Sequence, residues 1–229
     1  MTRSTPGPSL APTPLQLYQA LHERYGDLNW WPAEGPFQVM VGAVLTQRTS
    51  WRNVERALGN LEAAGVLDMV DLLSLPRDRL ESLIRPSGPY RQKAARLMEL
   101  FTMVDERGAG SLDAFLDRPA PDLREDLLTV HGIGPETADS IILYAAGMPA
   151  FVVDAYTRRV LGRVGVRTGR SYDQVASWFR EGLPEDAALF NNYHAALVEL
   201  AKDHCRTVPS CEDCPISGLC AVGRGEGSP

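Results

Sequence analysis

The stretch VHGIGPETADSI at residues 130–141 reads as a tight turn that leads into a helix. Gly132 and Gly134 stand two apart, and apolar residues then recur at helical spacing. The N–H groups at a helix start lack partners within the helix and favour a phosphate. Glu136, however, places a carboxylate in the first turn, which suits the helix dipole but repels a nearby phosphate. Either no phosphate binds here, or position 136 serves another purpose.

Helical periodicity continues along most of the chain, with apolar residues at three- and four-residue steps. Glycines follow several of these runs at positions where helices end. The longest strand-like run is only 151–153. The sequence therefore predicts an all-α fold with long helices at 15–26, 37–47, 51–65, 91–108, 136–147, 172–182 and 186–205, and short ones at 68–73, 77–84 and 121–129.

The length and the two ends of the chain set the frame for these helices. A chain of 229 residues fits one domain or two small ones. Residues 1–14 carry four prolines and no apolar signal region, so we expect a disordered tail, with a flexible tail at 221–229. The longest apolar run, 39–45, falls far short of the ~18 residues of a membrane helix. We expect no membrane partner and a cytoplasmic protein.

The charge of the chain gives opposing indications. A net charge of −6 and a pI near 5.3 count against a nucleic-acid partner. A basic cluster nevertheless spans 85–96, and no acid lies between Asp154 and Asp173. Solvated helix faces are the plain alternative for both basic segments. The five arginines of the second segment are Arg158, Arg159, Arg163, Arg167 and Arg170.

All four cysteines fall at the end of the sequence with the spacing C-x5-C-x2-C-x5-C. Disulfides are the first alternative, but a cytoplasmic chain keeps its thiols reduced. Zinc usually takes two C-x2-C knuckles, and only one is present. Four thiolates in one compact loop favour a [4Fe-4S] cluster over zinc. The ligands would be Cys205, Cys211, Cys214 and Cys220.

Three motifs in order, LLTVHGIGPETA, VVDAY and the cysteine loop, give a specific resemblance. The chain resembles the helix–hairpin–helix DNA glycosylases, such as endonuclease III, over about residues 15–220. The resemblance implies a monomer of two helical domains flanking a cleft for damaged double-stranded DNA. The segments 15–35 and 151–220 would form the iron–sulfur domain, and 36–150 a helical barrel with the hairpin. Amides around Gly132 and Gly134 would grip the DNA backbone.

Two acidic residues carry the chemistry that the resemblance implies. Glu136 stands where endonuclease III has its lysine nucleophile, and a carboxylate cannot form an imine. Asp154 matches the family's catalytic aspartate, which stabilises an oxocarbenium-like sugar and orients water. The expected enzyme is a glycosylase without lyase activity. Alternatively, both acids only cap helices and the chain is an inactive iron–sulfur DNA-binding relative.

The stretches 29–51 and 83–97 resemble the branch of the family that removes 3-methyladenine. Trp30, Trp31, Pro32 and Trp51 are the candidates for the base pocket. A purine methylated on a ring nitrogen is cationic, so stacking on an electron-rich face binds it. Oxidised or deaminated pyrimidines are the alternative substrates, and packing in the core is the alternative role of any single tryptophan.

The remaining candidates would contact DNA directly. Gln47 matches the glutamine that fills the gap left by the flipped base in endonuclease III, and an exposed amide is its alternative role. The opposite wedge would come from Pro89 and Tyr90, and phosphate contacts from Lys93, Arg158 and Arg159.

The chain departs from endonuclease III at the cysteines, with five residues between the first two in place of six.

Overall fold

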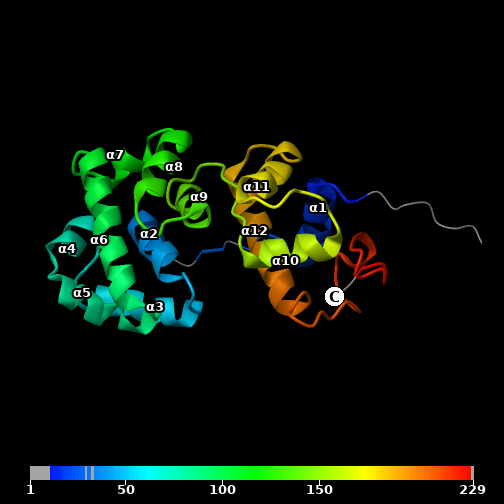
Figure 1. Cartoon of the computed structure of the whole chain (residues 1–229), viewed down its shortest axis with the longest axis horizontal. Coiled ribbons are helices and arrows are strands. Elements are labelled where there is room, and N and C mark those ends of the chain that lie inside the picture. The colour runs from blue at the N-terminus through cyan, green and yellow to red at the C-terminus, as the bar shows by residue number, and fades with distance from the viewer. Residues whose placement is uncertain (1–10, 29, 32–33, 228–229) are drawn as a thin grey trace, which may run out of the picture. The chain divides into compact units, whose positions relative to one another are not determined.

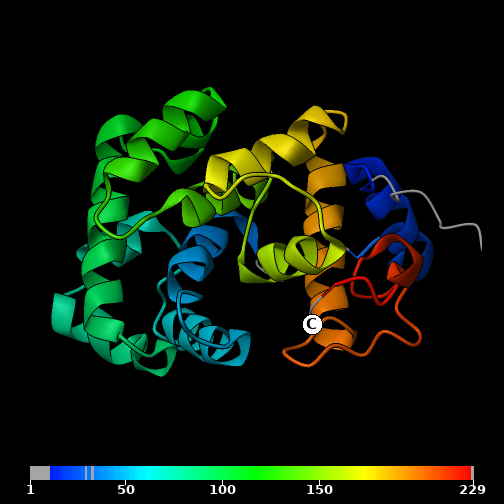
Figure 2. The ribbon, with the colours of Figure 1, turned by 45° about the vertical axis from the view of Figure 1, so that its right-hand side comes forward.

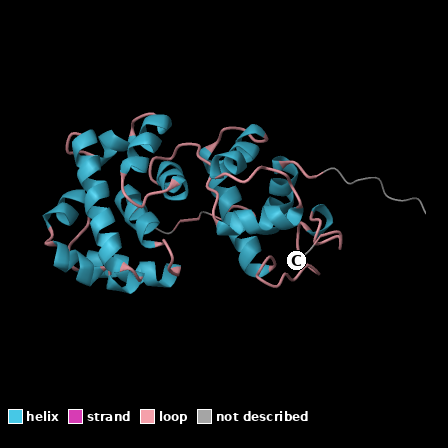
Figure 3. Ribbon diagram, viewed as in Figure 1, coloured by secondary structure: helices cyan, strands magenta, loops and turns pink. Residues whose placement is uncertain are grey.

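The computed structural model describes residues 11–28, 30–31 and 34–227. Helices joined by loops make up this part of the chain, and no strand occurs in it (Figure 3). The all-α prediction is confirmed. None of the described helices is long and apolar enough to cross a membrane. Figure 1 labels most of the helices along the chain.

The chain divides into two compact units. One unit consists of Trp31–Val152, and the other combines Met1–Trp30 with Val153–Pro229. The change of unit after Trp30 places two consecutive tryptophans in different units. The predicted domain boundaries had both in the segment 15–35.

The unit Trp31–Val152 contains eight α-helices and a short 3-10 turn. They are α2 (Gly35–Leu45), α3 (Trp51–Ala63), α4 (Met69–Ser74), α5 (Arg77–Leu83), η1 (Arg85–Ser87), α6 (Tyr90–Arg107), α7 (Leu112–Leu116), α8 (Ala120–Thr129) and α9 (Pro135–Tyr144). The helix α7 is absent from the sequence-based prediction, because five residues are too few to establish a period.

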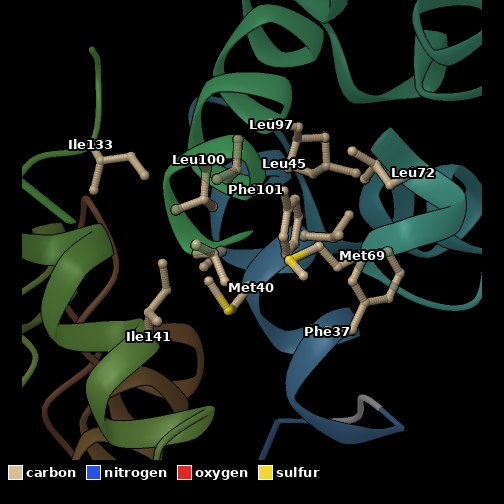
Figure 4. Close-up of a cluster of buried hydrophobic side chains, with 14 of the residues drawn as sticks. Phe37, Met40, Leu45, Met69, Leu72, Leu97, Leu100, Phe101, Ile133 and Ile141 are labelled. Carbon is tan, nitrogen blue, oxygen red and sulfur yellow. The ribbon is translucent and has the colours of Figure 1, made fainter. Parts of the chain in front are cut away.

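The core of this unit forms around α2, a helix that is apolar on nearly every side. All of its residues from Val39 to Leu45 are buried. Phe37 of α2 packs against Phe101 of α6 with ring centroids 5.2 Å apart (Figure 4). Helix α9 also packs on α2, and α8 packs on α9. The core therefore fixes the position of the turn between α8 and α9.

The second unit contains α1 (Pro14–Tyr25), α10 (Ala155–Val164), α11 (Tyr172–Glu181), α12 (Ala187–Asp203) and η2 (Ser217–Leu219). Helix α12 packs against both α1 and α10 (Figure 2). Asn192 of α12 accepts a hydrogen bond from Leu28 N at 2.8 Å and donates one to Gly26 O at 3.0 Å. These bonds attach the N-terminal segment to a helix that lies 164 or more residues away in sequence.

Part of each expected tail is folded in the structure. Thr13 caps α1, and Pro14, its first residue, is buried, while 1–10 lie outside the described residues. The segment 221–227 is not the flexible tail that we expected. Ala221 N donates to Val164 O and Val222 N to Arg163 O, both at 3.2 Å. The chain thus folds back on α10 after the last cysteine.

Candidate functional site

The hairpin between α8 and α9 is built by its two glycines. Gly132 has φ +85°, in the left-handed region that favours glycine. Gly134 is the N-cap of α9, and Pro135 follows at the first helical position. The N–H groups of Gly132 and Gly134 donate to no acceptor in the described part of the chain. Two free amides at a helix start are a suitable site for an anion.

An open groove of about 490 Å³ lies beside this hairpin, within the unit Trp31–Val152. We call it the hairpin groove. Six of its lining residues were predicted from the sequence as site residues. Its predicted members are Gln47, Pro89, Lys93, Gly132, Gly134 and Glu136, and its unpredicted members are Arg48, Gln92, Arg96 and Thr137.

Lys93 lines this groove but is not placed to contact a phosphate, and that prediction is wrong. The residue is 2% exposed, and its Nζ donates to Leu45 O at 2.8 Å and to Ser87 O at 2.6 Å. Burial, followed by the charge of Arg96, lowers the pKa of Lys93 to about 8. The ammonium therefore joins the end of α2 to the η1 turn.

The predicted wedge lies at the start of α6. Pro89 is exposed, and Tyr90 is half-buried. The guanidinium groups of Arg85 and Arg91 lie 6.0 and 5.8 Å from the centre of the Tyr90 ring. Cations within this distance of an aromatic face are attracted to it. Two arginines of the basic cluster at 85–96 thus lie against Tyr90, and the neighbouring Pro89 lines the groove.

Asp154 sits at the N-terminus of α10 and has two partners. Its Oδ1 accepts a hydrogen bond from Thr157 N at 2.7 Å, and its Oδ2 lies 3.6 Å from His194 Nε2. Burial by itself would raise the pKa of Asp154, but His194 and the Thr157 amide together hold it below its ordinary value of 3.8. The carboxylate is therefore ionised at neutral pH.

His194 is a site residue that sequence reasoning missed. It lies in the apolar run of α12, where a lone histidine reads as part of the core, and its side chain is 4% exposed. The Trp30 ring meets the His194 ring edge-on, with centroids 5.2 Å apart. Trp30 thus belongs to the surroundings of the Asp154–His194 pair.

The other two described candidate tryptophans come together in the unit Trp31–Val152. Trp31 stacks on Tyr144 with centroids 4.6 Å apart and meets Trp51 edge-on at 5.7 Å. We call these three residues the aromatic cluster. Trp31 has φ +93°, a strained backbone for a bulky residue. Tyr144 was not predicted, and the predicted Pro32 lies outside the described residues.

The arginines that follow Asp154 form hydrogen bonds with two different segments. Arg158 is exposed and donates to Arg170 O at 3.2 Å. Arg159 donates to Cys205 O at 2.7 Å, so it holds the cysteine segment, and its contact with a phosphate stays a prediction. Arg163 also binds this segment, with Nη1 3.3 Å from Cys205 Sγ.

The four cysteines line one cavity together with Arg163 and Ile216. All four thiols are free, and Cys205 and Cys220 are buried. Burial raises the pKa of Cys214 to about 11, and the charges of the other three thiols add to this increase. Among the described residues, no three Cys, His, Asp or Glu side chains come close enough together to hold one metal ion.

Comparisons with known proteins agree with this arrangement. Residues 41–185 match the family described as HhH-GPD superfamily base excision DNA repair protein. A Methanocaldococcus jannaschii protein classed provisionally as a DNA repair glycosylase is 44% identical over 90% of this chain and 94% of its own. Endonuclease III of Thermotoga maritima is 31% identical over 84% of this chain and 85% of its own.

One solved structure has both a similar fold and appreciable sequence identity. It is the 3-methyladenine DNA glycosylase of Helicobacter pylori bound to 1,N6-ethenoadenine. It matches with a TM-score of 0.76 and 29% identity over 83% of this chain and 98% of its own.

Proposed function

Because the chain belongs to the HhH-GPD superfamily of base excision DNA repair proteins, we propose that it removes alkylated purines such as 3-methyladenine from double-stranded DNA. The observation that carries this substrate class is the aromatic cluster, in which Trp31 stacks on Tyr144 and contacts Trp51. A cationic base gains affinity from such a surface without specific hydrogen bonds. The structural relative that binds ethenoadenine supports the choice of a modified purine.

Asp154 performs the chemical step in this proposal. Cleavage of the N-glycosidic bond gives the sugar oxocarbenium character, and a nearby carboxylate stabilises that charge. Ionised Asp154 supplies the negative charge, and it can orient the water that attacks the sugar. His194 holds the carboxylate from its Oδ2 side, and the Thr157 amide holds it from Oδ1.

We propose that the enzyme has no lyase activity, because the groove offers no available amine. The chain has two lysines, Lys93 and Lys202. The Lys93 ammonium is buried against two carbonyl oxygens, and Lys202 forms an ion pair with Glu199 at 2.6 Å. Glu136, which matches the lysine nucleophile of endonuclease III, lines the groove. Release of the base should therefore leave the DNA strand intact, with an abasic site.

The substrate test uses duplex DNA treated with a methylating agent, incubated with the enzyme with and without later alkali. We expect free 3-methyladenine, with strand breaks only after alkali. Trp31→Ala should lower release by about 5- to 150-fold, from a stacking loss of ~1–3 kcal/mol. Trp31→Phe should restore much of it, because an aromatic face remains.

Trp178→Ala is the matched control, since Trp178 contacts Phe179 in the other unit. It should leave release unchanged in a folded protein. No release of methylated purines, with release of oxidised or deaminated pyrimidines, would assign the alternative specificity. Strand breaks without alkali would contradict the monofunctional proposal. No base release from any of these duplexes would leave only a DNA-binding protein.

We also propose a [4Fe-4S] cluster with a structural role, held by the four cysteines. Such a cluster takes one thiolate on each iron, so its ligands surround it, whereas one zinc ion needs four ligands at ~2–2.3 Å. Four cysteines that line one cavity fit such a cluster. The bonds of Arg159 and Arg163 to the segment that begins at Cys205 would hold its ligand loop on α10.

Analysis of anaerobically purified protein tests the cluster. We expect about four iron and four acid-labile sulfide per chain. Cys214→Ser should lower both and reduce the melting temperature, because the loop loses its internal crosslink. Ser210→Ala, in the same loop, should retain both. Zinc without sulfide would contradict the proposal.

A further inference from the structure

Arg96 of α6 is hydrogen-bonded to the backbone of the hairpin. Its Nε donates to His131 O at 3.0 Å. Its guanidinium also lies directly against Gly132, where an added Cβ would clash with it. Glu99, one turn further along α6, accepts from His131 N at 3.0 Å. The hairpin backbone therefore rests on two charged side chains of one helix.

Gln47 is attached to the same groups. Its Nε2 donates to Thr137 Oγ1 at 2.9 Å and to Gly132 O at 3.2 Å, and its Oε1 accepts a short hydrogen bond from Arg96 Nη1. The end of α2, the hairpin and α6 thus form one hydrogen-bonded unit. Gln47 does not project freely into the groove.

Insertion of Gln47 into a duplex would break this arrangement. The side chain would give up its bonds to Gly132, Thr137 and Arg96. Arg96 Nη1 would then lose its acceptor, while Nε keeps its bond to His131 O. Arg96 lines the hairpin groove, as do Gly132 and Gly134 with their free N–H groups. A phosphate oxygen is a suitable replacement, because guanidinium–phosphate bonds are strong and directional.

We propose that Arg96 is a positioning residue that holds Gln47 in the free protein and exchanges it for a DNA phosphate when Gln47 enters the duplex. The inference rests on the proposed function. Under this proposal, Arg96 binds a phosphate only after Gln47 has entered a gap in the duplex. Binding of the DNA backbone by the hairpin is then coupled to filling of the gap.

The test measures the dependence of DNA affinity on salt for an undamaged duplex and for one with a tetrahydrofuran abasic-site analogue. The slope of the logarithm of the binding constant against the logarithm of the salt concentration becomes shallower by about 0.9 for each phosphate contact that is lost. We expect Arg96→Met to lower the slope by this amount on the abasic duplex but not on the undamaged one. Arg96→Lys should retain the slope, because its charge remains.

Gln47→Ala provides an independent measurement, because it releases Arg96 without changing it. This variant should steepen the slope on undamaged DNA by about 0.9. Arg107→Met is the control, since Arg107 lies at the far end of α6, 3.4 Å from Asp126, and should change neither slope.

Two outcomes would overturn the inference. One is an unchanged slope for Arg96→Met on the abasic duplex, and the other is an equal loss on both duplexes. If the wild-type protein neither prefers the abasic duplex nor releases bases, the proposed function itself fails, which is a distinguishable result.

Discussion

Asp154→Asn should lower the rate of base release by about 10³-fold while leaving affinity for duplex DNA unchanged. The substitution removes the charge that stabilises the sugar cation. It retains an amide oxygen that can accept from Thr157 N, and Asn is as good an N-cap as Asp. Single-turnover release of 3-methyladenine and a parallel binding assay measure the two quantities.

Two further variants separate the charge of Asp154 from its helix cap. Asp186→Asn changes the N-cap of α12, whose side chain accepts from Leu189 N at 2.9 Å, and should leave release unaffected. His194→Ala should reduce release less than Asp154→Asn, because the carboxylate survives. A fully active Asp154→Asn enzyme would show that another group stabilises the cation.

The same carboxylate has a defined effect on pH dependence. Its pKa lies below the ordinary 3.8, so Asp154 stays ionised into more acidic solution than a typical aspartate. Release in single-turnover assays should be lost only as pH falls through this lowered pKa, or earlier if the protein unfolds. The stabilising effect of Asp154 is likewise present above the unfolded pKa and lost below the folded one.

Glu136→Lys should change the outcome of the reaction from an intact strand to a covalent intermediate. Position 136 is exposed at the first turn of α9 and lines the hairpin groove. Arg48 and Arg96 line the same groove, and nearby positive charge lowers the pKa of a lysine amine. A neutral amine can attack the C1′ aldehyde of the abasic deoxyribose, and loss of water then gives an imine.

Borohydride trapping on an abasic duplex measures this gain. The wild-type protein should yield no trapped adduct, and Glu136→Lys should yield one together with strand breaks before alkali. Glu125→Lys makes the same change of charge on the exposed face of α8 and should trap nothing. Trapping by the wild-type protein would instead point to Lys93, the lysine that lines the groove.

Sequence by itself determined the features that depend on local pattern. Helical periodicity and the glycine turn predicted the helices on either side of Gly132 and Gly134, because backbone conformation follows from neighbouring residues. The order of the motifs identified the family, which the match over residues 41–185 shows. The Asp154 cap was also readable, because a preferred cap residue directly preceded a helical run.

Only the tertiary structure decided which side chains face which partners. Lys93 and Arg96 lie three residues apart on one basic helix, yet one is buried under α2 and the other supports the hairpin. Trp30 and Trp31 are adjacent, yet they belong to different units. His194 reaches Asp154 across 40 residues of sequence. Periodicity reports which face of a helix is apolar, whereas the partners on that face come from long-range packing.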